Sequence, residues 1–199
     1  MPVTPTPRTA LLTLVVSAGA LGWSAAAAPA ASAPANTVKA SRINRPAHTL
    51  ALGTTVAAST IFGNRVFTDA KHGFALADKG QAQYPAATTD GGKTWKTDGP
   101  ALHLNAAQAP LAVSTIGAAS RQTIFAWGSG QAVDVTGNGG KQWYRALFEG
   151  VPVAVVENPQ GHLVAFVDGF GSGSSGVTSQ YVSKDGGKSW HLDNRIGGS

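Results

Sequence analysis

The sequence predicts an all-β protein built from three similar repeats. Two observations carry this prediction. Gly accounts for 25 of the 199 residues and charged residues for only 13%, a composition that suits short strands joined by tight turns better than long solvated helices. A turn signature of Ser/Thr, Asp/Asn, Gly and Trp also recurs three times at nearly constant spacing. We therefore expect one small sheet in each repeat.

The first 33 residues have the features of a signal peptide. Arg8 is their only charged residue, and an uninterrupted run without charge follows from Ala10 to Trp23. Residues 28–30 and 31–33 offer small-residue cleavage sites. The apolar run is shorter than the ~20 residues that a membrane span needs. We expect a secreted mature protein with no stable membrane insertion; an uncleaved N-terminal anchor is the alternative.

The next segment differs in composition from the repeats. Residues 34–49 are rich in Pro, Ala and Ser with scattered Lys and Arg, which predicts a flexible linker. Apolar content rises from Leu50, and residues 54–62 are a candidate first strand. The β domain is therefore expected over residues 50–199. It contains no Cys, so no disulfide can hold it together.

The repeat itself has the pattern Ser/Thr-x-Asp/Asn-x-Gly-x-x-Trp. Its third position falls at Asp90, Asn138 and Asp185, which are 48 and 47 residues apart. Periods of this length indicate one supersecondary unit per repeat, stacked on its neighbours. Four short strands fit each period, which is the size of a β-propeller blade. The expected strands are 65–69, 74–77, 86–88 and 94–96; then 111–116, 123–127, 132–136 and 142–147; then 153–157, 163–167, 179–183 and 189–192.

Tight-turn geometry explains the residue types in this pattern. Gly reaches positive φ without steric cost, and an Asp or Asn side chain can accept hydrogen bonds from turn N–H groups. Trp then packs its large apolar face against a neighbouring element. Asn138 shows that a neutral amide suffices, so the position is expected to hold the turn and not to transfer protons. The residues interpreted as structural are Thr88, Asp90, Gly92, Trp95, Thr136, Asn138, Gly140, Trp143, Ser183, Asp185, Gly187 and Trp190.

These three turns resemble Asp-boxes, also called bacterial neuraminidase repeats, which occur in sialidases, sortilin-type receptors and photosystem II assembly factors. The resemblance covers about residues 64–192. The stretch Asp69-x-x-His72-Gly73-Phe74-Ala75 also resembles a pattern of the assembly-factor branch. The resemblance implies a β-propeller in which the boxes are structural and lie on the face opposite the functional site.

That implication points to the loops at the other end of each repeat. They are residues 79–83, 98–108, 146–150 and 168–176. Within them, the residues that we expect on a binding face are His103, Glu149, Asp168 and Phe170.

The sequence offers little support for an enzymatic function. A sialidase-like hydrolase needs an arginine cluster, a Tyr nucleophile with a Glu partner and an Asp acid. The stretch Arg42-Ile43-Asn44-Arg45-Pro46 departs from the family's Arg-Ile-Pro motif. The sequence contains no nucleophile elbow, zinc-ligand spacing or phosphate loop. We expect no catalytic residues, no metal and no cofactor.

The distribution of charged residues limits which functions are expected. The formal net charge is +5, but Lys and Arg are dispersed, whereas nucleic-acid binding needs a clustered basic surface. We expect an exported, non-enzymatic binding or scaffold protein that recognises a protein or glycan at the cell surface. One alternative is a carbohydrate-active, sialidase-like hydrolase, or a degenerate remnant of one, completed by another chain. Another is an assembly factor of the photosystem type.

Three repeats are too few to close a ring, because propellers typically have 4 to 8 blades. We therefore expect an array of three four-stranded blades that is incomplete or open in the single chain. Its apolar end surfaces would favour a homodimer or a partner chain that completes the propeller.

Overall fold

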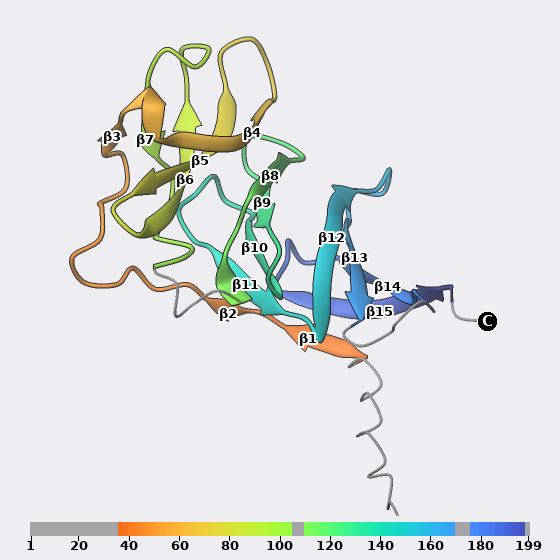
Figure 1. Ribbon diagram of the computed structural model, residues 1–199. Helices are drawn as coiled ribbons and strands as arrows, with labels where there is room; N and C mark the ends of the chain where they lie inside the picture. Colours follow the sequence, from red (N-terminus) through yellow and green to blue (C-terminus); the bar gives the residue numbers. More distant parts are fainter. Residues whose placement is uncertain (1–35, 105–109, 170–175, 198–199) are drawn as a thin grey trace, which may run out of the picture. The chain divides into compact units, whose positions relative to one another are not determined.

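The computed structural model describes residues 36–104, 110–169 and 176–197. These residues form three five-stranded antiparallel sheets (Figure 1). The first sheet contains β3 (Thr55–Val56), β4 (Ile61–Phe67), β5 (Gly73–Lys79), β6 (Ala82–Thr88) and β7 (Trp95–Thr97). The second contains β2 (Ser41–Arg42), β8 (Thr115–Ala118), β9 (Ile124–Trp127), β10 (Ala132–Thr136) and β11 (Tyr144–Leu147). The third contains β1 (Thr37–Lys39), β12 (Gly150–Glu157), β13 (Leu163–Gly169), β14 (Thr178–Ser183) and β15 (Ser189–Ile196).

The all-β prediction is confirmed, and the three sheets are consistent with a β-propeller-like arrangement. The only helix among the described residues is the short 3₁₀ turn η1 (Ala58–Thr60). In that part of the chain, no helix has the length and apolar character needed to cross a membrane.

Each sheet has five strands, so the prediction of four strands per blade is wrong. Four strands of each sheet are consecutive in the chain, and the fifth comes from residues 37–56, which we call the strap. The strap supplies β1 to the third sheet, then β2 to the second, then β3 to the first (Figure 1, orange). A count of strands within each repeat could not find these additional strands, because they come from outside the repeats.

The strap pairs with the same place in every sheet, beside the Trp of the repeated turn. Val38 lies opposite Trp190, and Val56 lies opposite Trp95. In the second sheet, the Ile43 N–H donates to the Trp143 carbonyl at 2.8 Å. Part of the segment expected to be a flexible linker is therefore strand. The physical reason is visible at Thr37–Lys39, where the pattern exposed–buried–exposed lets Val38 pack while the backbone pairs.

The core lies between the sheets. Side chains of the first sheet, such as Phe74 and Leu76, pack with Ile116 and Ile124 of the second. Val133 of the second sheet packs in a further cluster with Leu163 and other residues of the third. Alternate residues along a strand point to opposite faces, so the second sheet contributes apolar side chains to both clusters.

Polar side chains also tie neighbouring sheets together. The Asn64 amide on β4 donates to the Ile116 carbonyl at 2.7 Å and accepts from the Ile116 N–H at 2.9 Å. On the second sheet, Asp134 and Arg145 are opposite each other in the β10–β11 register. Arg145 also donates to the Leu102 carbonyl. This bond attaches the segment that follows β7 to β11 of the second sheet.

The outer faces of the first and third sheets differ. Leu50, Val56 and Ile61 pack over the outer face of the first sheet, against Ala75 and Trp95. The strap and the start of β4 therefore cover this face.

The corresponding face of the third sheet is partly exposed. Val156, Val164 and Val182 are in register across β12, β13 and β14, so they share one face. None of the buried clusters in the described part of the chain includes them. Val156 is 46% exposed, whereas Val164 between its neighbours is only 5% exposed. The apolar row on this face, Val156, Val164 and Val182, is called the free face below.

Candidate functional site

The first repeated turn, residues 88–95, is held by its own side chains. The Thr88 hydroxyl donates to Asp90 Oδ1 at 2.8 Å and accepts from the Gly92 N–H at 2.9 Å. Asp90 Oδ1 accepts from the Thr94 N–H, and Oδ2 accepts from the Thr94 hydroxyl at 2.6 Å. The side-chain and backbone bonds from Thr94 hold the pKa of the Asp90 carboxyl well below its ordinary value. The carboxylate therefore stays ionised while it organises the turn.

The third turn, residues 183–190, repeats this geometry. Asp185 accepts from the Ser183 hydroxyl at 2.9 Å and from both the N–H and the hydroxyl of Ser189. Burial opposes ionisation of Asp185, but the bonds from Ser189 and Ser183 outweigh it and lower its pKa. The Gly187 N–H donates to Ser183 at 2.8 Å.

The second turn, residues 136–143, is held by a neutral amide. Asn138 Oδ1 accepts from the Gln142 N–H at 2.9 Å and from the Thr136 hydroxyl at 3.1 Å. It lacks the hydroxyl-to-carboxylate bond that Thr94 and Ser189 make in the other turns. This turn therefore keeps the backbone lock without a negative charge.

The second turn also packs closely against the end of the first sheet. The Trp143 indole donates to the Asp98 carbonyl at 2.9 Å. Gly140 has a positive φ of 79°, and a Cβ there would collide with the backbone and carboxyl of Asp98. Gly is therefore required at this position for two reasons, conformation and space.

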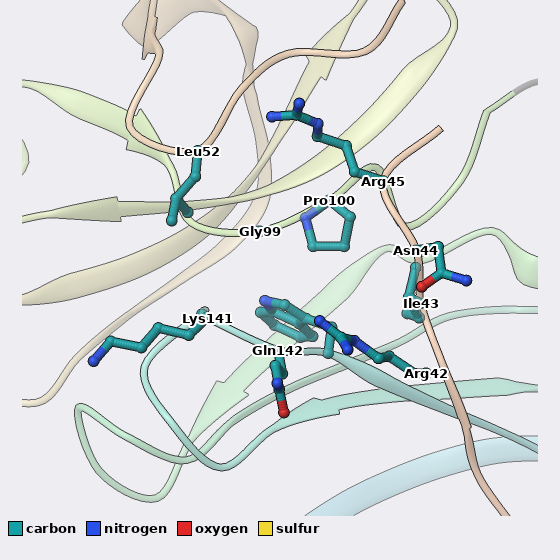
Figure 2. Close-up of a pocket in the computed structure, with 11 residues that line it drawn as sticks. Arg42, Ile43, Asn44, Arg45, Leu52, Gly99, Pro100, Lys141 and Gln142 are labelled. Carbon is teal, nitrogen blue, oxygen red and sulfur yellow. The ribbon is translucent and has the colours of Figure 1, made fainter. Parts of the chain in front are cut away.

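A hollow of about 240 Å³ opens where the strap passes this contact (Figure 2). We call it the basic groove. In Figure 2, Arg45 and Arg42 lie on either side of Pro100, with Lys141 across the hollow from the strap. Its lining residues are Arg42, Ile43, Asn44, Arg45, Leu52, Gly99, Pro100, Gly140, Lys141, Gln142 and Trp143.

The cations of the basic groove form no ion pairs with described residues, although the half-buried Asp98 carboxyl lies behind Gly140. Arg42, Arg45 and Lys141 are exposed, and none of them forms an ion pair with a described residue; the ion pairs in that part of the chain involve Asp69 and Asp134. No acidic residue lines the groove. Its surface is therefore positively charged at neutral pH.

A second hollow of about 220 Å³ continues along the strap. It shares Arg42 and Ile43 with the basic groove and adds Lys39, Ser41, Arg145 and Leu147. Arg145 contributes no net charge there, because its guanidinium binds both oxygens of the fully buried Asp134 at 2.7 and 2.6 Å. Burial raises the pKa of Asp134 to about 6, which still leaves the pair ionised at neutral pH.

Of the four residues predicted for a binding face, the structure describes three, and two of these, Glu149 and Asp168, lie at the same end of the β12–β13 pair. His103 lies beside the first sheet, where it bridges to Gln83, and its two buried ring nitrogens make no hydrogen bond to described residues. Glu149 is exposed before β12, and Asp168, near the end of β13, accepts from the Thr178 hydroxyl at 2.6 Å. Phe170 lies outside the described residues.

Sequence reasoning missed the basic groove. Its cations come from the supposed linker and from the second turn, which was interpreted as purely structural. The available signal is the stretch Arg42-Ile43-Asn44-Arg45, in which two cations lie three residues apart. In the described part of the chain, His, Asp and Glu side chains do not gather in threes as around a metal ion.

The chain resembles solved structures but no family model or curated protein. No protein-family model matches the sequence, and no curated protein matches it either. Among solved structures, the chain is similar to one described as YCF48 bound to D1 peptide, with 17% sequence identity and a TM-score of 0.36. The likeness covers 76% of this chain and 61% of that one.

We predict that Asp185→Ala destabilises the protein by roughly 1–2 kcal/mol, because several turn donors lose their acceptor. Asp185→Asn is the matched control: it keeps one acceptor oxygen, as Asn138 does in the second turn, and should lose less than half as much. Urea unfolding measures both free energies. Equal losses for the two variants would contradict this account of the turn.

A second prediction concerns Asp98, which is half-buried beside the basic groove. Burial raises its pKa from 3.8 to about 6. The folded state therefore binds a proton more tightly than the unfolded state, and stability falls as the pH rises from about 4 through 6. Asp98→Asn removes this penalty, so its stability relative to wild type should increase across that window, by on the order of 2 kcal/mol.

Urea unfolding at several pH values measures this difference. Glu157→Gln, at the exposed end of β12, is the control and should show no such trend. A pH-independent difference for Asp98→Asn would mean that the Asp98 carboxyl is not desolvated.

Proposed function

We propose that this is an exported, non-enzymatic binding or scaffold protein that holds an anionic protein or glycan of the cell surface in the basic groove. The observation that carries the proposal is the set of three exposed cations, Arg42, Arg45 and Lys141, that line one hollow without an acidic partner among the described residues. Unpaired like charges repel one another, so an anionic ligand would relieve that repulsion. The features of a signal peptide in residues 1–33 motivate the assignment to the cell surface.

Packing and hydrogen bonds hold the backbone around the groove, which favours binding. Trp143 is fully buried and its indole is hydrogen-bonded. The strap is attached at the same point through the bond from the Ile43 N–H to the Trp143 carbonyl. A held backbone lets the long side chains of Arg42 and Arg45 meet a ligand without a loop having to order first.

The second turn has an uncharged Asn where the other turns have an Asp, so it does not reduce the positive potential of the groove. Gln142 lines the groove and donates its N–H to Asn138. In the other turns, the residues equivalent to Asn138 are Asp90 and Asp185. Asn138 itself lines a neighbouring hollow with Asp185 and Lys188, and its amide keeps a further negative charge out of the turn that carries Lys141.

The placement of the tyrosines favours binding over the hydrolase alternative. A sialidase-like nucleophile must reach a sugar from a solvent-filled cleft. Tyr181 is 1% exposed and packs against Phe148 with ring centroids 5.0 Å apart, and Tyr84 is buried as well. The Lys188 ammonium lies over the Tyr144 ring, 5.6 Å from its centroid, and the Tyr144 hydroxyl donates to Gln142 Oε1.

We predict that the mature protein, immobilised on beads, captures an anionic component from envelope extracts of the producing organism. Capture should weaken at high salt, because exposed charge pairs are screened, and should fall strongly in an Arg42→Gln, Arg45→Gln double variant. Asn138→Asp should reduce capture without unfolding the protein, since it restores the turn residue of the other repeats. Lys93→Gln, on the exposed first turn, is the control, and equal loss in this control would contradict a specific groove.

The proposal includes self-association through the free face. The outer face of the first sheet is already covered by Leu50, Val56 and Ile61, so the free face, on which Val156 is exposed and Val164 is buried, is the candidate surface for a second copy. We predict a concentration-dependent rise in mass by light scattering, which Val156→Lys abolishes. Ile196→Lys, at another exposed position, is the control. A wild-type monomer across the micromolar range would contradict self-association.

A further inference from the structure

We infer that the ligand of the basic groove is a protein segment that carries a Lys or Arg side chain beside its acidic residues, and that Asp98 binds this cation. This inference rests on the proposed function, because it names the ligand class for the same site. It places an acceptor for positive charge next to the three cations of the groove.

The side chain of Asp98 has no partner in the described part of the chain. The backbone of Asp98 is fully used, since its N–H donates to the Pro85 carbonyl at 2.8 Å and its carbonyl accepts from the Trp143 indole at 2.9 Å. The half-buried carboxyl makes no hydrogen bond or ion pair with a described residue. A desolvated carboxylate without donors costs free energy in the folded state, and exceptions of this kind are expected at functional sites.

Asp98 lies between the basic groove and a neighbouring hollow. Gly140 lines the groove, and a Cβ on Gly140 would collide with Asp98 Oδ1. Asp98 itself lines the neighbouring hollow, which has a volume of about 230 Å³. Leu52, labelled in Figure 2, borders both hollows and is 56% exposed. A ligand can therefore extend from one hollow into the other over Leu52.

The positive charges around Asp98 leave its carboxylate available. Lys96 is the one cation among the described residues that line the neighbouring hollow, and it forms no ion pair with Asp98. Lys141 of the second turn and Arg42 and Arg45 of the strap line the basic groove instead. None of these pairs with Asp98 either, so a ligand can supply the missing cation.

A Lys or Arg side chain of a protein fits these two hollows. Its aliphatic stem can pack on the exposed Leu52, and its charged end can donate to the Asp98 carboxylate. Thr89 is exposed in the same hollow, and its hydroxyl can accept a further N–H. Acidic polysaccharides seldom carry a free amine, whereas acidic protein segments often include Lys or Arg. An unpaired acid next to unpaired cations therefore favours a protein segment over a glycan.

The test compares poly-glutamate with a glutamate–lysine copolymer of the same length in which most residues are glutamate. Isothermal titration calorimetry on the mature protein, at neutral pH and low salt, measures both affinities. Attraction by net charge alone would make poly-glutamate the tighter ligand. We expect the copolymer to bind roughly two- to five-fold more tightly, the effect of one additional charge pair.

The preference for the copolymer should disappear in Asp98→Asn and persist in Glu157→Gln, an acid at the exposed end of β12. Thermal melts confirm that both variants are folded. Acidification provides a second measurement, because burial raises the pKa of Asp98 to about 6. The carboxyl is ionised at neutral pH and mostly protonated at about pH 5, so the wild-type preference should fall as the pH decreases through 6.

Three outcomes would overturn the inference. One is equal or tighter binding of poly-glutamate by the wild type. Another is a preference for the copolymer that survives in Asp98→Asn, which would locate the cation elsewhere. The third is envelope capture that is unaffected by protease treatment of the extract, which would identify a glycan as the ligand. If one of these occurs while capture still depends on Arg42 and Arg45, only this inference is wrong; if capture is independent of both, the proposed function is wrong.

Discussion

The structure depends on the pairing of one strap with three sheets beside their buried tryptophans. Trp95, Trp143 and Trp190 are each at most 2% exposed, and the strap pairs or hydrogen-bonds beside each of them. Without it, β7, β11 and β15 would become edge strands with unpaired N–H and C=O groups next to large apolar rings, a liability in any sheet protein. The strap satisfies these edges and connects the three sheets along their outer side.

The basic groove follows from that arrangement. The second turn must approach Asp98 closely, because Gly140 and the Trp143 indole both contact its backbone. The strap must pass the same point to pair with β11. The strap and the second turn therefore border one hollow, and each contributes at least one cation to its lining. The site needs no loop of its own.

The repeat was predictable from the sequence, and the site was not. Spacing and residue type at Asp90, Asn138 and Asp185 predict the turns, because those hydrogen bonds are local. The strap strands were missed because each is two or three residues long, too short for a periodic signal. Their pairing partners are distant, as with Val38 and Trp190, and single-chain periodicity carries no information about such contacts. The cations Arg42 and Lys141 are brought together only by that long-range pairing.

Asn138 connects the stability of the fold with the chemistry of the groove. In the first and third turns, the ionised Asp gains a second-oxygen bond from Thr94 or Ser189 at 2.6 or 2.5 Å, and charge-assisted bonds of this kind are stronger than neutral ones. The second turn makes no equivalent bond from a hydroxyl at position 142, which is Gln. Trp143 and Gly140 contact the first sheet, which anchors the turn by packing, as Gly187 against Val135 does in the third turn. A turn anchored in this way can be held by an amide in place of a carboxylate, and the turn that carries Lys141 then has no negative charge of its own.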